Sequence, residues 1–274
     1  VLHHHAHASA LAGEHPDISG WLVFTWDGVG YGGDGTLWGG EALLGAPGRW
    51  KRVASFRPFK LVGGDKAGRE PWRSAAALMW GEDRPWDPGV PGAQLAESAW
   101  RHDTGVHETS AAGRLFDAAA ALVTGRKSAS FEGQGPMELE ALAGGTGKPL
   151  PLPLSEDDKG IWRADWAQLL TMLNDESIEP RQRAADFHAS MAQSAIDQAM
   201  HLATGHRFEA VGLSGGVFQN RALSEAIRSG LAARGIDVRL HERVPANDGG
   251  LCFGQIIESL ALSHSAAGEG MLRP

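Results

Sequence analysis

The sequence predicts an α/β fold, and three segments carry this prediction. Residues 21–26 (WLVFTW) form an almost entirely apolar run of strand length. Residues 180–205 predict a long helix, with a proline at its start and a glycine at its end. Residues 209–235 predict a strand, a Gly-Gly turn and a helix in succession. Strands and helices that alternate in this way are typical of an α/β fold.

Weaker patterns extend this prediction along the chain. Residues 3–15 predict an amphipathic helix, because they are rich in alanine and meet no strong helix breaker before Pro16. The prolines between residues 149 and 153 predict a lobe boundary near residues 144–180. The other expected elements are extended segments within 20–60, mostly helix in 71–125 with 111–122 as the clearest case, a strand at 238–243 and a final helix to about residue 264.

Composition excludes several classes of protein. The 274 residues suffice for one large domain or two packed lobes. The formal net charge of -8 argues against a nucleic-acid-binding surface, which needs a basic patch. We find no run of 18 apolar residues and no signal-peptide pattern. The single cysteine, Cys252, excludes an internal disulfide and a CxxC zinc site. We therefore expect a cytoplasmic protein with no membrane or nucleic-acid partner.

Four histidines lie within five positions near the start of the chain. His3 and His7 are four residues apart, so on a helix they share a face and can point at one ion. Neutral imidazole is a common ligand of zinc and iron. The alternative is a tag remnant. The cluster continues directly into a predicted helix, which favours a metal site.

A second candidate metal ligand lies near the other end of the sequence. Asn247 and Asp248 precede two glycines, between the predicted strand and the final helix. A carboxylate there can reach a metal or a phosphate-bound cation. The alternative is a helix N-cap. Two histidines and one carboxylate would leave coordination positions open for a substrate.

Two glycine-rich segments are candidate phosphate-binding loops. Residues 212–220 (GLSGGVFQN) place Gly-Gly between a strand and a helix, where backbone N–H groups can face an anion, although the segment is neither a Walker loop nor GxGxxG. Residues 27–41 hold DGVGYGGDG followed by LWGGE, with Asp27 as a further candidate metal ligand. The alternatives are a tight strand–helix turn and plain hairpins.

An aspartate within a predicted helix needs a partner. Asp117 lies in the motif GRLFD, and Phe131-Glu132-Gly133 follows in the next loop. Aspartate is mildly unfavourable in the middle of a helix. A ribose hydroxyl is one candidate partner, and a salt bridge to Arg114 or Arg126 is the other.

Taken together, these motifs resemble the C-terminal carbamoyltransferase domain of the hydrogenase maturation protein family HypF. The resemblance also extends to TsaD, which modifies tRNA, and to antibiotic O-carbamoyltransferases such as TobZ. It implies an actin- and sugar-kinase-like fold, with two lobes around a nucleotide cleft. The motifs that carry it are, in order, VLHHHAH (1–7), DGVGYG (27–32), LWGGE (37–41), GGD (63–65), PWR (71–73), GRLFD (113–117), LSGGVFQN (213–220) and ANDGG (246–250).

The resemblance implies a role for each candidate residue. The metal, zinc or iron, would be held by His3, His7 and Asp248, with Asp27 as a fourth ligand. His4 and His5 are candidates for proton relay, with packing as the alternative for each. Asp117 would hold the ribose of ATP or of carbamoyl-adenylate. The full candidate nucleotide-binding set is Gly28, Gly30, Gly113, Asp117, Glu132, Gly133, Ser214, Gly215, Gly216, Asn220 and Asn247.

The family's chemistry sets the expected function. HypF proteins make carbamoyl-adenylate from ATP and carbamoyl phosphate, and pass the carbamoyl group to the C-terminal cysteine of HypE. The acylphosphatase, zinc-finger and YrdC-like domains of full HypF are not within these residues, and the chain begins at the histidine cluster, so we expect a fragment that lacks opening strands. The transfer half-reaction is the expected activity. The alternatives are a TobZ-like transferase acting on a small molecule and a non-enzymatic, actin-like nucleotide switch.

Overall fold

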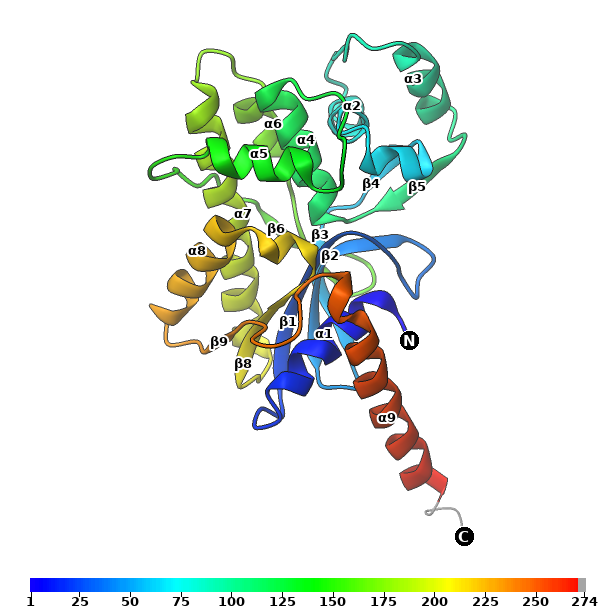
Figure 1. The fold of residues 1–274 in the computed structure, drawn as a ribbon, viewed down its shortest axis with the longest axis vertical. Helices are drawn as coiled ribbons and strands as arrows, with labels where there is room; N and C mark the ends of the chain where they lie inside the picture. The colour runs from blue at the N-terminus through cyan, green and yellow to red at the C-terminus, as the bar shows by residue number, and fades with distance from the viewer. Residues whose placement is uncertain (271–274) are drawn as a thin grey trace.

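The computed structural model describes residues 1–270, with side chains described to residue 264. Within this range the strands form one mixed, nine-stranded sheet (Figure 1). Its main path runs β6-β7-β3-β2-β1-β8-β9, and β4 and β5 join beside β2. The strands are β1 (Trp21–Tyr31), β2 (Leu37–Gly45), β3 (Lys51–Phe56), β4 (Phe59–Val62), β5 (Val106–Thr109), β6 (Leu154–Glu156), β7 (Trp162–Ala164), β8 (Ala210–Ser214) and β9 (Val238–Arg239).

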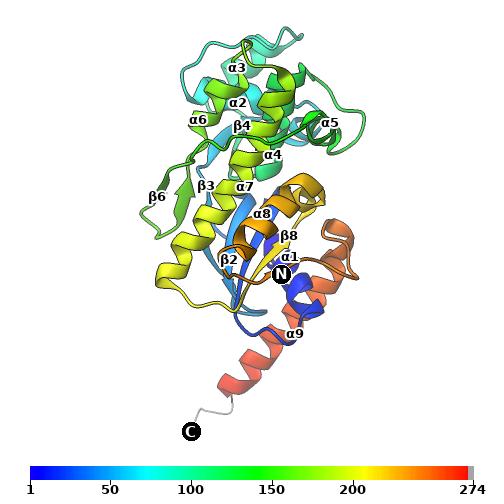
Figure 2. The ribbon, with the colours of Figure 1, turned by 90° about the vertical axis from the view of Figure 1, so that its left-hand side faces the viewer.

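The helices cover both faces of the sheet and one of its ends. Helices α2 to α6 gather with β4 and β5 at that end, and α7 runs from there along the sheet (Figures 1 and 2). The helices are α1 (His3–Glu14), η1 (Gly64–Gly68), α2 (Trp72–Gly81), α3 (Ala93–Arg101), α4 (Ala112–Thr124), α5 (Gln134–Leu142), α6 (Ala167–Leu173), α7 (Pro180–Gly205), η2 (Gly216–Gln219), α8 (Arg221–Ala232), η3 (Asp248–Gly250) and α9 (Leu251–Gly270).

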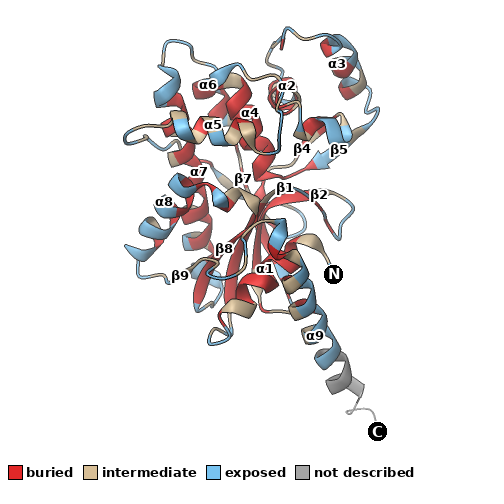
Figure 3. Cartoon of the chain, viewed as in Figure 1, coloured by how far each residue is buried: buried red, intermediate tan, exposed pale blue. Residues whose placement is uncertain are grey.

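Strand β1 lies inside the sheet, between β2 and β8, and its residues 21–26 are buried on both faces (Figure 3). Leu22, Phe24 and Trp26 point into the larger core, which α4 and α7 help to form. Trp21 and Val23 point to the opposite face, where they pack with α1. Successive strand residues face opposite sides, so a strand covered by helices on both sides needs a continuous apolar run. The sequence of β1 has this run, and the prediction for residues 21–26 is confirmed.

Helix α1 is confirmed, but it is not amphipathic. Its residues from Ala6 to Ala12 are all buried, because α1 lies between the sheet and α9. Glycines allow this close packing: a Cβ at Gly254 of α9 would overlap the carbonyl oxygen of Ala6. The small side chains of α1 therefore let the helix pack closely against both the sheet and α9.

Four further expectations met different outcomes. The long helix at 180–205 is confirmed as α7, and residues 209–235 form β8, η2 and α8 as predicted. The segment 71–125 also contains strand β5, which the sequence analysis did not predict. The strand expected at 238–243 was too long, because β9 ends at Arg239 and the following backbone amides bind a side chain instead.

The expected lobe boundary near residues 144–180 stays a prediction. This stretch carries β6 and β7, and β7 pairs with β3, so the stretch belongs to the same sheet as the strands before and after it. Among the described residues, no helix combines the length and the apolar character that a membrane span requires.

Candidate metal centre

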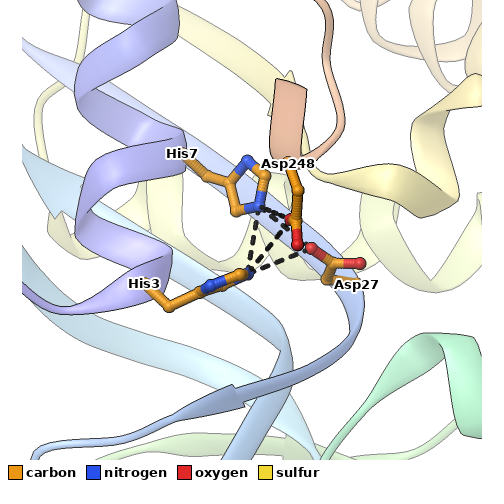
Figure 4. A group of neighbouring side chains, drawn as sticks. All are labelled: His3, His7, Asp27 and Asp248. Atoms are coloured by element: carbon orange, nitrogen blue, oxygen red, sulfur yellow. Dashed lines mark hydrogen bonds and ion pairs between the residues drawn. The ribbon is translucent and has the colours of Figure 1, made fainter. Parts of the chain in front are cut away.

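Four candidate ligands from three distant parts of the sequence meet beside β1, where its buried part ends (Figure 4). His3 and His7 lie one turn apart on α1, Asp27 follows the buried part of β1, and Asp248 begins η3. Their nearest ligand atoms all lie within 4.8 Å of one another. We call His3, His7, Asp27 and Asp248 the metal cluster. The predicted convergence of these residues is thus present in the structure.

The contacts within the metal cluster are short. Oδ2 of Asp27 lies 2.9 Å from Nε2 of His7 and 3.2 Å from Nε2 of His3. The two Nε2 atoms are 3.2 Å apart. Oδ1 of Asp248 lies 3.3 Å from Nε2 of His7 and 3.6 Å from Nε2 of His3. Each side chain therefore directs a nitrogen or oxygen toward one common point.

Local backbone structure directs both carboxylates. The pairing of β1 with β2 shifts register between Trp26 and Gly30, and this bulge turns Asp27 toward α1. At η3 it is Asn247 whose side chain accepts the N–H of Gly249, so Asn247 is the N-cap. The N-cap alternative for Asp248 is therefore wrong, and its carboxylate faces the histidines instead.

The spacing of these atoms fits a first-row metal ion. Ligand atoms at about 2.0–2.2 Å from a metal lie roughly 3.3–3.6 Å apart in a tetrahedral site and roughly 3.0 Å apart in an octahedral one. The nitrogen–oxygen and nitrogen–nitrogen separations in the metal cluster, 2.9–3.6 Å, span both arrangements. Imidazole and carboxylate suit zinc and iron alike, so the donor set accommodates either ion.

The same contacts set the protonation of the metal cluster. Burial alone would lower the pKa of His7, but hydrogen bonds with Asp248 and Asp27 raise it above its ordinary value. Burial would raise the pKa of Asp27, yet hydrogen bonds with His3 and His7 hold it well below its usual range. Asp27 is therefore ionised at neutral pH and can ligate a cation. Metal binding would displace a proton from His7.

The two remaining histidines of the motif point elsewhere. His4 is fully buried, and among the described residues neither of its ring nitrogens has a hydrogen-bond partner. Burial lowers the pKa of His4 well below its ordinary value, so it stays neutral. Nδ1 of His5 lies 3.7 Å from the carboxylate of Glu258 on α9. The catalytic roles of His4 and His5 stay predictions, and the contacts favour the packing alternative.

One group of candidate nucleotide-binding residues lies beside Asp27. A Cβ at Gly216 would lie 3.1 Å from Oδ1 of Asp27 and 3.9 Å from Cβ of Asn247. Gly215 has a positive φ of 105° and lies so close to the carbonyl of Trp26 that no side chain fits. The Oγ of Ser214, one residue earlier, donates to the carbonyl of His7 instead. The turn after β8 thus lies directly against the metal cluster.

A second group lies on the other side of the end of β1. A Cβ at Gly113 would lie 2.7 Å from Cα of Gly28, so glycine lets the start of α4 contact the backbone of β1. Asp117 is buried and lies 2.7 Å from Nη1 of Arg114, as the salt-bridge alternative predicted. Glu132 is exposed near Gly28, and Gly133 is the N-cap residue of α5, with a positive φ of 75°.

Two members of the candidate set have other contacts. A Cβ at Gly30 would lie 2.5 Å from Cε1 of His4 and 2.7 Å from Cδ2 of His3, so Gly30 makes room for the histidines. Asn220 is the N-cap of α8, where it accepts the N–H of Leu223, and its amide contacts His188 at 2.9 Å. A direct nucleotide contact by Gly30 or Asn220 stays a prediction.

Comparison with known proteins identifies the family. Residues 23–255 match the family model of the carbamoyltransferase, Kae1-like domain, second subdomain. A carbamoyltransferase HypF homolog from Cupriavidus necator is 36% identical over 271 residues, which cover 93% of this chain and 69% of that protein. The chain belongs to the HypF carbamoyltransferase family. A second HypF, from Rhodobacter capsulatus, is 41% identical over 271 residues, which cover 95% of this chain and 35% of that protein.

Solved HypF structures share the fold. The crystal structure of full-length HypF in its phosphate- and nucleotide-bound form matches 94% of this chain, with a TM-score of 0.85 and 28% sequence identity. HypF from T. kodakarensis matches 97% of the chain, with a TM-score of 0.84. The predicted α/β, actin- and sugar-kinase-like fold class is thus confirmed. The chain spans about a third of the length of these two crystallised HypF chains.

The sequence analysis missed two polar residues behind the metal cluster. Glu14, at the end of α1, and His241, after β9, are hydrogen-bonded to each other and lie next to the turn at Ser214. Glu14 accepts backbone N–H groups from the loop that leads to Asp248. A glutamate in the last turn of a helix carries no local signal of such a role, because most glutamates there are exposed.

Proposed function

We propose that this chain forms the metal- and nucleotide-binding centre of a carbamoyltransferase. The observation that supports this most strongly is the metal cluster, in which His3, His7, Asp27 and Asp248 direct ligand atoms to one point beside a glycine turn. Zinc or iron would be the bound ion. A purely structural ion pair would not need two histidines that share their carboxylate partners.

The nucleotide, ATP or carbamoyl-adenylate, would lie across the end of β1. Gly216 borders Asp27 on one side, Ser214 and Gly215 directly precede it, and backbone N–H groups in this turn can face phosphate oxygens. The second group borders Gly28 on the other side and would contact the ribose. That group consists of Gly113, Asp117, Glu132 and Gly133.

The proposed reaction is carbamoyl transfer from carbamoyl-adenylate. A carbamoyl carbonyl is a poor electrophile because its nitrogen donates electrons to it, and the link to AMP supplies a good leaving group. A bound metal would neutralise phosphate charge and polarise the carbonyl. The acceptor thiolate forms the new sulfur–carbon bond, the bond from that carbon to the phosphate oxygen breaks, and AMP leaves with the electron pair.

The proposed acceptor is the C-terminal cysteine of a HypE-like protein, in the synthesis of the cyanide ligands of [NiFe] hydrogenases. This proposal follows from membership of the HypF family. The net charge of -8 favours a protein acceptor over a nucleic acid. We propose a cytoplasmic location for the reaction.

The test combines metal analysis with a transfer assay. Purified protein is loaded with Zn²⁺ or Fe²⁺, dialysed, and given carbamoyl-adenylate with either a HypE-type C-terminal cysteine peptide or a small aminoglycoside alcohol. We expect about one tightly held ion per chain and carbamoylation of the peptide alone. The His7→Ala variant should lose both the ion and the transfer, because His7 contributes the most buried ligand of the metal cluster.

The matched control is His206→Ala, which removes an exposed histidine far from the metal cluster. It should retain metal and activity. Transfer to the alcohol but not to the peptide would replace the proposed acceptor with a small molecule. Nucleotide binding without any transfer would favour an actin-like switch. A chain that holds no metal would overturn the proposed site.

A further inference from the structure

A continuous chain of hydrogen bonds lies behind the metal cluster and joins three elements. Oε1 of Glu14 lies 2.7 Å from Nδ1 of His241. Nε2 of the same imidazole lies 2.8 Å from Oγ of Ser214. That hydroxyl in turn lies 2.9 Å from the backbone carbonyl of His7. We call Glu14, His241 and Ser214 the relay.

Glu14 also holds the loop that leads to Asp248. Its carboxylate accepts the backbone N–H groups of Glu242 at 3.0 Å, Arg243 at 2.6 Å and Val244 at 3.3 Å. Hydrogen bonds from backbone N–H groups to an ionised carboxylate are among the stronger ones in proteins. One side chain of α1 therefore fixes three successive amides of the 240–247 loop.

The relay has the atom order of a hydrolytic triad, but it is not placed for nucleophilic attack. Ser214 is fully buried, at the end of strand β8, which lies between β1 and β9. A nucleophile must reach the substrate, and this hydroxyl contacts the protein backbone instead. The relay therefore acts within the protein.

We propose that the relay is a positioning device that sets the distance between Asp248 and the histidines of α1. It connects the backbone of His7 to the loop that carries Asp248. This inference rests on the proposed metal site. The side chain of Asp248 is 67% exposed, so its own packing does little to fix it. The buried relay supplies the missing constraint.

The physical basis is preorganisation of the ligands. A ligand that must be ordered during binding lowers the affinity by the cost of ordering it. Residues that hold metal ligands in place contribute about 10- to 100-fold to metal affinity. The relay fixes the loop before the ion arrives, so its loss should weaken binding through Asp248 and leave the other ligands in place.

The test replaces Glu14 with glutamine, which keeps the shape and removes the charge. Metal affinity is measured by competition with a chromogenic chelator for Zn²⁺, and amide hydrogen exchange is followed in residues 242–248 of the metal-free protein. We expect Glu14→Gln to weaken Zn²⁺ binding about 10- to 100-fold and to speed exchange in this loop. The milder variant Ser214→Ala should also weaken Zn²⁺ binding and speed amide exchange in this loop, by smaller amounts.

A double-mutant cycle separates positioning from general stability. In an Asp248→Ala background, Glu14→Gln should cause almost no further loss of affinity, because the relay acts through Asp248. The control Glu138→Gln, which weakens the remote pair of Glu138 with Arg126, should change neither affinity nor loop exchange.

The outcomes distinguish this inference from the proposed function. If wild-type protein binds no Zn²⁺ or Fe²⁺, the proposed metal site fails, and faster loop exchange in Glu14→Gln still measures the constraint. If wild-type protein binds metal and both relay variants bind it equally well, the inference is overturned. Equal losses in the wild-type and Asp248→Ala backgrounds would overturn it as well.

Discussion

Two buried or partly buried sets of charged side chains in this molecule differ in whether their charges pair with one another. One is the metal cluster. The other is a buried network around Glu41 and Arg52, in which the guanidinium contacts Glu41, Asp34, Ser55 and Ser110. The Glu41 carboxylate also accepts two backbone N–H groups, and the guanidinium lies 4.4 Å from the ring centre of Trp38.

The two sets differ in where their polar atoms point. In the Glu41–Arg52 network, positive and negative groups alternate, so the charges satisfy one another within the protein. In the metal cluster, two imidazole nitrogens and two carboxylates, all of them groups that can ligate a cation, face one point. Buried charges that pair internally hold a fold together, whereas converging acceptors indicate a place for a cation. Burial alone does not distinguish the two.

The first prediction tests the Glu41–Arg52 network by removing its guanidinium. Arg52→Ala leaves the fully buried Glu41 carboxylate without its counter-charge, and loss of one partner of a buried pair costs about 3–5 kcal/mol. Urea unfolding should show this loss in the free energy of unfolding. The control Arg221→Ala, in an exposed pair with Glu225, should cost less than about 1 kcal/mol. Equal effects of the two substitutions would contradict this interpretation.

The second prediction concerns Asp117, a buried carboxyl group that has one charged partner, Arg114, but is not fully stabilised in its ionised form. Burial outweighs the attraction of Arg114 and, with the charge of Glu132, raises the pKa of Asp117 to about 6. Because the folded state holds this proton more tightly than the unfolded state, stability falls as the pH rises from about 4 to about 6. The loss amounts to up to about 3 kcal/mol.

Asp117→Asn should abolish this contribution, because asparagine does not titrate. Urea unfolding across that pH range should give a flatter curve for the variant than for the wild type. The control Asp17→Asn makes the same chemical change at an exposed position. If the Asp117→Asn curve runs parallel to that of the wild type, the elevated pKa is wrong.

The third prediction sharpens the comparison at the metal cluster itself. Gly30→Ala would place a Cβ against the rings of His3 and His4, and overpacking of this kind costs about 1–3 kcal/mol. Displacement of His3 should also weaken Zn²⁺ binding by about tenfold or more. The matched control is Gly205→Ala, where the new methyl group meets open space. A Gly30→Ala variant with wild-type Zn²⁺ affinity would show that the His3 ring is not held by this contact.

The smallest predicted effect belongs to His4. Replacing it with leucine removes two buried nitrogens that have no partner among the described residues, which should raise the free energy of unfolding by about 1 kcal/mol. The neighbouring variant His5→Leu loses the contact with Glu258 and should lower the free energy of unfolding. Calorimetry measures the stability of both variants, and the transfer assay measures their activity. Loss of transfer in a stable, metal-loaded His4→Leu protein would assign His4 a catalytic role.

Sequence reasoning located the metal cluster because helical spacing pairs His3 with His7, and because Asp27 and Asp248 each lie in a glycine-rich segment where a carboxylate can reach a cation. It did not separate the capping role of Asn247 from the free carboxylate of Asp248, since both residue types cap helices equally well. The relay could not be predicted from the sequence, because Glu14 and His241 lie far apart in sequence and only the packing of α1 brings them together.

The fold was predicted best where one segment carries its own pattern. The apolar run of β1 and the full length of α7 are local features, and both were found. The burial of α1 was not, because an alanine-rich helix looks the same whether one side or every side is covered. Strand β5 was missed since its exposed residues show no apolar pattern.

The contact between α1 and α9 has a consequence for how the protein is made. A ribosome delivers Asp248 more than 200 residues after His3, His7 and Asp27. Until Asp248 emerges, a nascent polypeptide presents an incomplete set of the proposed ligands. Tight capture of an ion would wait for this segment to dock, so metal loading would follow the docking of α9 on α1.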